Sequence, residues 1–214
     1  MAIYVTSDAH GHVRALDEAL SKISLASDDT LYVLGDMIDR GPDPVGVIKL
    51  VRSLPNARVL KGNHEQIMLD AIIGQDPLDA ETWDINGGWT TRQQLNDMEF
   101  EAYEELVRWM ATLPLYAVAE TDERPYLLVH AGIQTEAARA FLLEHGVDCA
   151  DGAGAVDADR ELLKQMLAVQ SSDDLLWIRH GYWDAPTGLL SAEGKGPVVV
   201  SGHTPTVSLG RYCE

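Results

Sequence analysis

The junctions between short apolar segments and polar motifs constrain the fold of this chain more than any other feature. Five segments have the composition of buried strands, and side chains of metal-ligand type end each one or follow it directly. These segments are residues 2–6, 31–34, 58–60, 126–130 and 197–201. Because ligand sites in open α/β sheets form at the carboxyl ends of strands, the pattern predicts a functional site built by several loops.

The segments between the first strands predict an α/β fold. Apolar residues recur at helical spacing over residues 12–24, and Val45, Ile48 and Val51 mark a second helix that ends before Pro55. The resulting β-α-β-α-β order favours parallel strands covered by helices.

The rest of the chain adds helices and further strands. Residues 65–113 are expected to be helical, with an interruption at 86–88. A further strand is predicted at 115–119, and helices are predicted between about 135 and 170. We therefore expect a single domain over residues 1–214, with a helical, cap-like insertion at roughly 65–113.

Composition excludes some classes of function. The formal net charge of −18 argues against non-specific binding to nucleic acid or to an anionic membrane. The two cysteines, Cys149 and Cys213, indicate no disulfide framework and favour a reducing compartment. The opening residues lack a signal-peptide pattern, and no segment is long and apolar enough to span a bilayer. We expect a cytoplasmic monomer.

The residue types at the strand ends indicate a metal site. Aspartate, histidine and asparagine supply oxygen and imidazole ligands, which favours ions such as Mn, Fe or Zn over metals bound by thiolates. At least six such side chains follow the strands, which is too many for one four-coordinate ion. Two ions that share a carboxylate fit better, and such pairs catalyse the in-line displacement of phosphate groups.

The motifs resemble those of the bacterial members of the serine/threonine phosphoprotein phosphatase family, in the calcineurin-like metallophosphoesterase superfamily. They are SDAHG at 7–11, GDMIDRG at 35–41, GNHE at 62–65, HAG at 130–132 and GHT at 202–204. Their order matches that of the family, and they cover nearly the whole chain. The resemblance implies an α/β sandwich of two mixed sheets packed face to face, with helices outside in α-β-β-α layers.

The resemblance also implies two divalent ions, most commonly Mn, with Fe and Zn as alternatives. The first ion would be bound by Asp8 and His10, both ions would be bridged by Asp36, and the second would be bound by Asn63, His130 and His203. A water between two cations loses its proton near neutral pH. The expected reaction is direct attack by a metal-bridging hydroxide, without a covalent phosphoenzyme.

Four further residues receive catalytic roles from the resemblance. His64 would be the general acid that protonates the leaving alkoxide, and Asp39 would orient it. Arg40 would hold the phosphate, and Arg179 lies where bacterial members carry a second phosphate-binding arginine. The segment WDINGG at 83–88 resembles a segment near the site mouth in bacterial members, and it receives no catalytic role.

Three functions remain to be compared. The motifs favour hydrolysis of phosphoserine or phosphothreonine proteins, with phosphotyrosine as a further substrate. The nearest alternative is a symmetrical bis(5′-nucleosyl)-tetraphosphatase or another small-molecule phosphoesterase. That relative usually has alanine at the position of Asp39 and aspartate at the position of Glu65, so the sequence favours the phosphatase. A module that binds phosphoproteins without catalysis is the third possibility, and the presence of every expected ligand argues against it.

Overall fold

The first three predicted strands form an all-parallel sheet. In the computed structural model, which describes residues 1–74, 76–180, 182 and 186–205, the strand order is β1-β2-β3. The strands are β1 (Ile3–Thr6), β2 (Thr30–Val33) and β3 (Ala57–Val59). Ile3 pairs with Thr30 and Leu31 with Ala57, so all three carboxyl ends lie at the same edge of the sheet.

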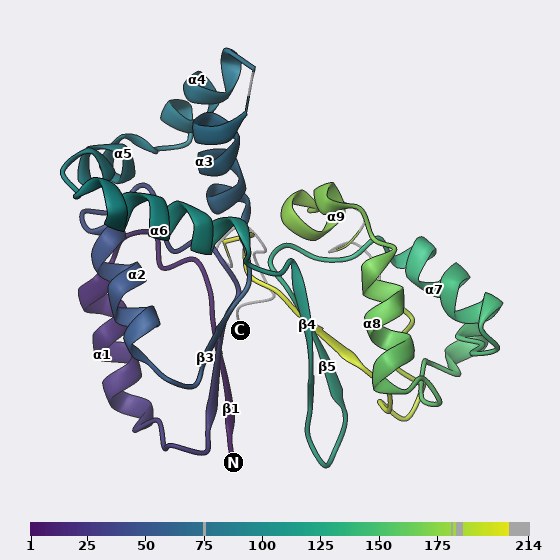
Figure 1. Cartoon of the computed structure of the whole chain (residues 1–214). Helices are drawn as coiled ribbons and strands as arrows, with labels where there is room; N and C mark the ends of the chain where they lie inside the picture. The colour runs from purple at the N-terminus through teal and green to yellow at the C-terminus, as the bar shows by residue number, and fades with distance from the viewer. Residues whose placement is uncertain (75, 181, 183–185, 206–214) are drawn as a thin grey trace. The chain divides into compact units, whose positions relative to one another are not determined.

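Two amphipathic helices pack beside this sheet. Figure 1 shows α1 (Val13–Ile23) and α2 (Pro44–Ser53) next to each other along it. Helix α2 begins after Asp43, whose side chain accepts a hydrogen bond from Gly46 N, and its first residue is proline, whose fixed φ suits that position. Their buried side chains join the strands in one core, which includes Leu16, Leu31, Val33, Ile48 and Val51.

The region predicted to be helical contains four helices in the structure. They are α3 (Asn63–Ile73), α4 (Leu78–Ile85), α5 (Trp89–Asn96) and α6 (Phe100–Ala111). Trp83, Leu95, Leu106 and Met110 from these helices belong to the same core as the first sheet. The helices therefore extend that core.

A second sheet forms from residues after 114. It has the order β4-β5-β6, with β4 (Tyr116–Glu120) antiparallel to β5 (Pro125–Val129) and β5 parallel to β6 (Val198–Val200). Helices α7 (Thr135–Glu144), α8 (Arg160–Ala168) and α9 (Ser172–Trp177) accompany it, with a 3-10 turn at Ala150–Gly152. Helix α8 packs against β4 and α7 against α8, around a separate core that includes Leu127, Leu142 and Leu163.

These elements confirm the α/β class, with two small sheets flanked by helices. The chain divides into two compact units, an N-terminal unit (residues 1–114) and a C-terminal unit (residues 115–214). That the whole chain is one domain with a cap-like insertion stays a prediction. Within the part of the chain that the structure describes, no helix has the length and apolarity needed to cross a membrane. Cys213 lies outside the described residues.

Candidate metal and phosphate site

The loops after β1 and β2 are joined by backbone hydrogen bonds in the N-terminal unit. Asp8 N donates to Gly35 O at 3.1 Å, and His10 N donates to Asp36 O at 2.9 Å. The loop after β3 adds a third connection, because His64 N donates to Asp36 Oδ1 at 3.0 Å. The parallel sheet thus brings the first three sequence motifs together, as the strand-end pattern predicts.

Unusual backbone conformations are concentrated in the predicted site residues. Among the described non-glycine residues, positive φ angles occur at Asp8, His10, Ser24, Asp36, Asp39, Arg40 and His203. Only Ser24, the C-cap of α1, lies outside the predicted site. A residue other than glycine is strained when its φ angle is positive, and such residues tend to be held in place at functional sites.

His10, Asp36 and His64 form a group with the geometry of a metal site. Ligand atoms of the three side chains all lie within 4.8 Å of one another. His10 Nε2 lies 3.5 Å from Asp36 Oδ2 and 4.0 Å from Asp8 Oδ1. The other ring nitrogen of His10, Nδ1, is 2.8 Å from Ile38 O. A carbonyl only accepts hydrogen bonds, so Nδ1 carries the proton and Nε2, which lies near the carboxylates, does not.

The electrostatics of this group also fit a cation. Burial, with the nearby Glu65 and Asp8 carboxylates, raises the pKa of Asp36 well above its usual range. Burial also lowers the pKa of His10 to about 4, assisted by the positive charge of Arg40. A bound cation would favour the ionised carboxylate and the neutral imidazole, which are the forms that bind metals. Asn63, the first residue of α3, is buried next to His64.

His64 and Asp39 form a buried pair. His64 Nδ1 lies 2.7 Å from Asp39 Oδ2, and neither side chain is exposed to solvent. Arg40 donates from Nη2 to His64 Nε2 and from Nη1 to His10 Nε2, both at 2.8 Å. Because a guanidinium only donates, His64 Nε2 is unprotonated here and its Nδ1 carries the proton that Asp39 accepts.

Glu65 connects the loops after β2 and β3 through its side chain. Its fully buried carboxylate accepts hydrogen bonds from Asp36 N, Met37 N and Gly62 N, each at 2.8 Å. Gly62 must be glycine at this contact, because a Cβ there would lie 2.2 Å from Asp36 Oδ1. Glu65 is therefore placed to fix the backbone on both sides of Asp36.

The C-terminal unit brings its own three predicted residues together. His130 follows β5 and His203 follows β6, and their rings approach with His130 Nε2 3.2 Å from His203 Nδ1. Gly202 N donates to His130 O at 2.8 Å. Arg179, just after α9, donates from Nε to His203 Nε2 at 3.0 Å. Both histidines are buried. The hydrogen bonds above thus bring two imidazoles and one arginine together in this unit.

Two residues without a predicted role contact Asp39. Trp83 Nε1 donates to both carboxylate oxygens, at 3.1 and 3.2 Å, and Thr91 Oγ1 donates to Oδ1 at 2.6 Å. Trp83 opens the WDINGG segment singled out in the sequence, whereas the only signal for Thr91 is its position just after that segment.

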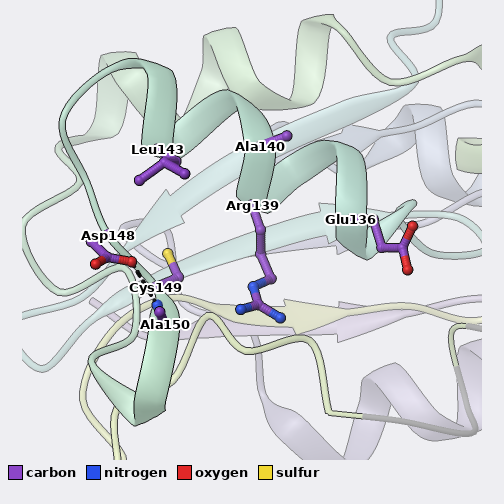
Figure 2. Close-up of a pocket in the computed structure, with 7 residues that line it drawn as sticks. All are labelled: Glu136, Arg139, Ala140, Leu143, Asp148, Cys149 and Ala150. Atoms are coloured by element: carbon purple, nitrogen blue, oxygen red, sulfur yellow. Dashed lines mark hydrogen bonds between the residues drawn. The ribbon is translucent and has the colours of Figure 1, made fainter.

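A separate hollow of about 250 Å³ lies in the C-terminal unit, beside α7 (Figure 2). Arg139 extends from α7 toward the turn that contains Cys149, and Ala150 N donates to Asp148 Oδ1 at 2.8 Å. Burial raises the pKa of the Cys149 thiol, which disfavours the reactive thiolate. No predicted site residue lines this hollow, and it carries no functional assignment.

Comparison with known proteins identifies related sequences. A family model described as Calcineurin-like phosphoesterase matches residues 1–214. A protein of Proteus mirabilis (strain HI4320), named bis(5′-nucleosyl)-tetraphosphatase, symmetrical, is 29% identical over 100% of this chain and 68% of its own length. A protein of the same name from Salmonella paratyphi C (strain RKS4594) is 30% identical over 73% of this chain. The chain spans only 50% of that second relative.

Solved structures include a metallophosphoesterase from Sphaerobacter thermophilus. It is 27% identical, covers 61% of this chain and 46% of its own, and superposes with a TM-score of 0.43.

Proposed function

The chain belongs to the Calcineurin-like phosphoesterase family, and on that basis we propose that it hydrolyses phosphate esters or anhydrides with the help of two divalent ions. The observation that carries the proposal is the approach of His10 Nε2 to the carboxylates of Asp36 and Asp8, at 3.5 and 4.0 Å, next to the buried His64–Asp39 pair. Imidazole and carboxylate ligands of this kind suit Mn, Fe or Zn.

The proposed ligands are the six residues that the sequence motifs imply. They are Asp8, His10, Asp36 and Asn63 in the N-terminal unit, and His130 and His203 in the C-terminal unit. Bound ions would polarise the phosphate oxygens and make a water more acidic. The orientation of His10 supports its place in this set, because its unprotonated Nε2 lies near Asp8 and Asp36. An ion would replace Arg40 as the partner of that nitrogen.

Three further side chains, those of His64, Arg40 and Arg179, would contact the leaving group or the phosphate. For His64 to act as general acid, its Nε2 must carry a proton, while Nδ1 keeps its hydrogen bond to Asp39. Arg40 cannot donate to a protonated Nε2, so protonation of His64 would free Arg40 Nη2 for a phosphate oxygen. Arg179 would add a second such donor from the C-terminal unit.

The proposed substrates are dinucleoside polyphosphates such as diadenosine tetraphosphate. The curated relatives described above carry the name of the symmetrical tetraphosphatase, which supports this substrate class over the phosphoproteins that the sequence motifs favour. Cleavage at the centre of the tetraphosphate would release two nucleoside diphosphates, whose phosphate oxygen is a weak base and a good leaving group.

Phosphoserine and phosphothreonine esters are the second candidate. Asp39 and Glu65 occupy positions where the tetraphosphatase usually has alanine and aspartate, and both make close contacts here. An alkoxide is a strong base, so its departure benefits from a positioned acid far more than the departure of a diphosphate does. The His64–Asp39 pair therefore supports activity toward esters.

One experiment separates these functions. Purified protein would be given Mn²⁺, Fe²⁺ or Zn²⁺ and assayed on para-nitrophenyl phosphate, diadenosine tetraphosphate and a phosphoserine peptide, beside Asp36→Asn and His64→Asn. We expect metal-dependent hydrolysis that Asp36→Asn abolishes, with diadenosine tetraphosphate turned over fastest. Faster release of phosphate from the peptide would favour the second candidate. Metal binding without hydrolysis of any substrate would overturn the proposal and indicate a binding module.

A further inference from the structure

We propose that Trp83 and Thr91 are positioning residues that fix the Asp39 carboxylate and, through it, the ring of His64, which gives the site its capacity to cleave esters with poor leaving groups. The inference rests on the proposed function, because it takes His64 as the proton donor to the leaving group.

The first step is the environment of Asp39. Its carboxylate has no exposed surface, and a buried carboxylate is costly unless hydrogen bonds satisfy it. Three donors converge on it, namely His64 Nδ1, Trp83 Nε1 and Thr91 Oγ1. Two of them come from the helical region after the third motif, so α4 and α5 complete a site that the strand-end loops begin.

The second step is that the same segment also holds the backbone around Asp39. Asp39 N donates to Thr91 Oγ1 at 2.9 Å, so one hydroxyl contacts both the main chain and the side chain of this residue. Arg40 N donates to Gly87 O at 3.0 Å. Asp39 and Arg40 both have positive φ, a conformation that needs such support from its surroundings.

The third step concerns the tryptophan itself. Trp83 is buried, and its indole packs so closely on Gly88 that a Cβ at Gly88 would lie 2.3 Å from Nε1. This contact restricts the movement of the indole, whose N–H donates to Asp39. Since Asp39 Oδ2 binds His64 Nδ1, the direction of His64 Nε2 depends on this chain of contacts.

The chemical consequence depends on the leaving group. In ester hydrolysis, a water oxygen forms a new bond to phosphorus and releases a proton to solvent. The bond to the leaving oxygen breaks, and its electron pair goes to that oxygen, which takes a proton from His64 Nε2; solvent returns a proton to His64. An alkyl leaving oxygen needs this proton, whereas 2,4-dinitrophenolate leaves without it.

The test compares these two kinds of ester in the metal-loaded protein. Trp83→Phe removes the N–H and keeps the ring, and Thr91→Val removes the hydroxyl and keeps the shape. Each variant should lower kcat on an alkyl phosphate such as β-glycerophosphate about tenfold, as expected for the loss of one hydrogen bond to a charged group. Each should leave kcat on 2,4-dinitrophenyl phosphate within about twofold. Thr91→Ser should retain the wild-type ratio.

The same segment offers matched controls. Trp89 is 61% exposed, and the hydroxyl of the buried Thr90 has no hydrogen-bond partner among the described residues. Trp89→Phe and Thr90→Val should leave kcat on both esters unchanged. An equal loss on both esters in Trp83→Phe and Thr91→Val would indicate a merely structural role, and no loss on either would indicate no role. Both results would overturn the inference.

A second readout does not require activity. The Nδ1–H proton of His64 should give a downfield NMR resonance, identified by its absence in His64→Asn, because it donates to a carboxylate. Thr91→Val and Trp83→Phe should shift or broaden this resonance, whereas Thr90→Val should not; an unchanged resonance would contradict the inference. A wild-type protein without any phosphoesterase activity would overturn the proposed function, and the resonance alone would then decide whether Trp83 and Thr91 hold the ring.

Discussion

The two units carry different numbers of site loops, and the direction of their strands accounts for the difference. In the N-terminal sheet all three strands are parallel, so the loops after β1, β2 and β3 leave the same edge. In the C-terminal sheet only β5 and β6 are parallel, and β4 runs the opposite way. Two loops then leave one edge, and they carry His130 and His203. Strand direction thus sets how many ligand loops a small sheet can supply.

The units also differ in how their site residues are supported. In the N-terminal unit, side chains from α3, α4 and α5 hold the loops, namely Glu65, Trp83 and Thr91. In the C-terminal unit, the hydrogen bonds at the site loops include those from Gly202 N to His130 O, from Ala131 N to Leu175 O and from Arg179 to His203.

The largest expected effect comes from removing one predicted ligand in each unit. Asp36→Asn and His203→Asn should each lower metal-dependent hydrolysis by at least about 10³-fold, because metal ions contribute several kcal/mol to the transition state and about 1.4 kcal/mol is tenfold. Asparagine tolerates the positive φ at both positions. Activity and bound metal would be measured together.

The control for this prediction is His145→Asn, at the exposed end of α7 in the C-terminal unit. It should behave as wild type. Full activity in His203→Asn would contradict the claim that both units supply required ligands, because the N-terminal unit would then suffice for catalysis.

A second, smaller effect is expected at Glu65. Glu65→Gln replaces an acceptor of three backbone N–H groups with an amide whose own N–H₂ faces donors. We expect a loss of about 2–4 kcal/mol in the free energy of unfolding, since a buried charged acceptor is removed and donors lose their partner. Metal affinity should fall about 10–100-fold, as for other residues that orient ligands. Denaturant unfolding and metal titration would measure these changes, and unaltered metal affinity would show that Glu65 serves stability alone.

The third prediction concerns pH in the metal-free protein. The pKa of His10 is lowered from 6.5 to about 4 by burial, so between these values only the unfolded state binds the proton. The contribution of neutral His10 to the free energy of unfolding is therefore present above pH 6.5 and is lost as the pH falls toward 4. The raised pKa of Asp36 acts with the opposite sign, because the folded state keeps a proton above the usual value.

Comparing wild type with His10→Asn isolates the histidine from Asp36. Chemical denaturation from pH 7 to pH 4 should show a steeper loss of stability in the wild type than in the variant. Parallel curves would mean that His10 titrates normally in the folded protein.

The strands and the ligand loops are predictable because both are local in sequence. The observed strands end within a residue or two of their predicted limits. For example, β2 ends at Val33, whereas the predicted strand ends at Leu34. The direction of β4 also follows from its short connection to β5, since so few residues only allow a hairpin.

The support of Asp39 is not predictable in this way. Trp83 and Thr91 lie 44 and 52 residues from Asp39 in sequence. A tryptophan on an apolar helix face usually indicates packing, and no local pattern reports which buried carboxylate its N–H will meet. The same limit applies to Arg40, whose contacts with His10 and His64 depend on how three loops fold over one another.

The smallest expected effect distinguishes one folding unit from two. Asp43 caps α2 in the N-terminal unit by accepting from Gly46 N, and Asp159 caps α8 in the C-terminal unit by accepting from Leu162 N. Replacing either by alanine should cost about 1 kcal/mol. If the chain is a single domain, as the sequence predicts, both variants should lower one common melting transition by about 2–4 °C. Two transitions, each shifted by only one of the variants, would show that the units unfold separately and that each sheet stabilises only its own ligand loops.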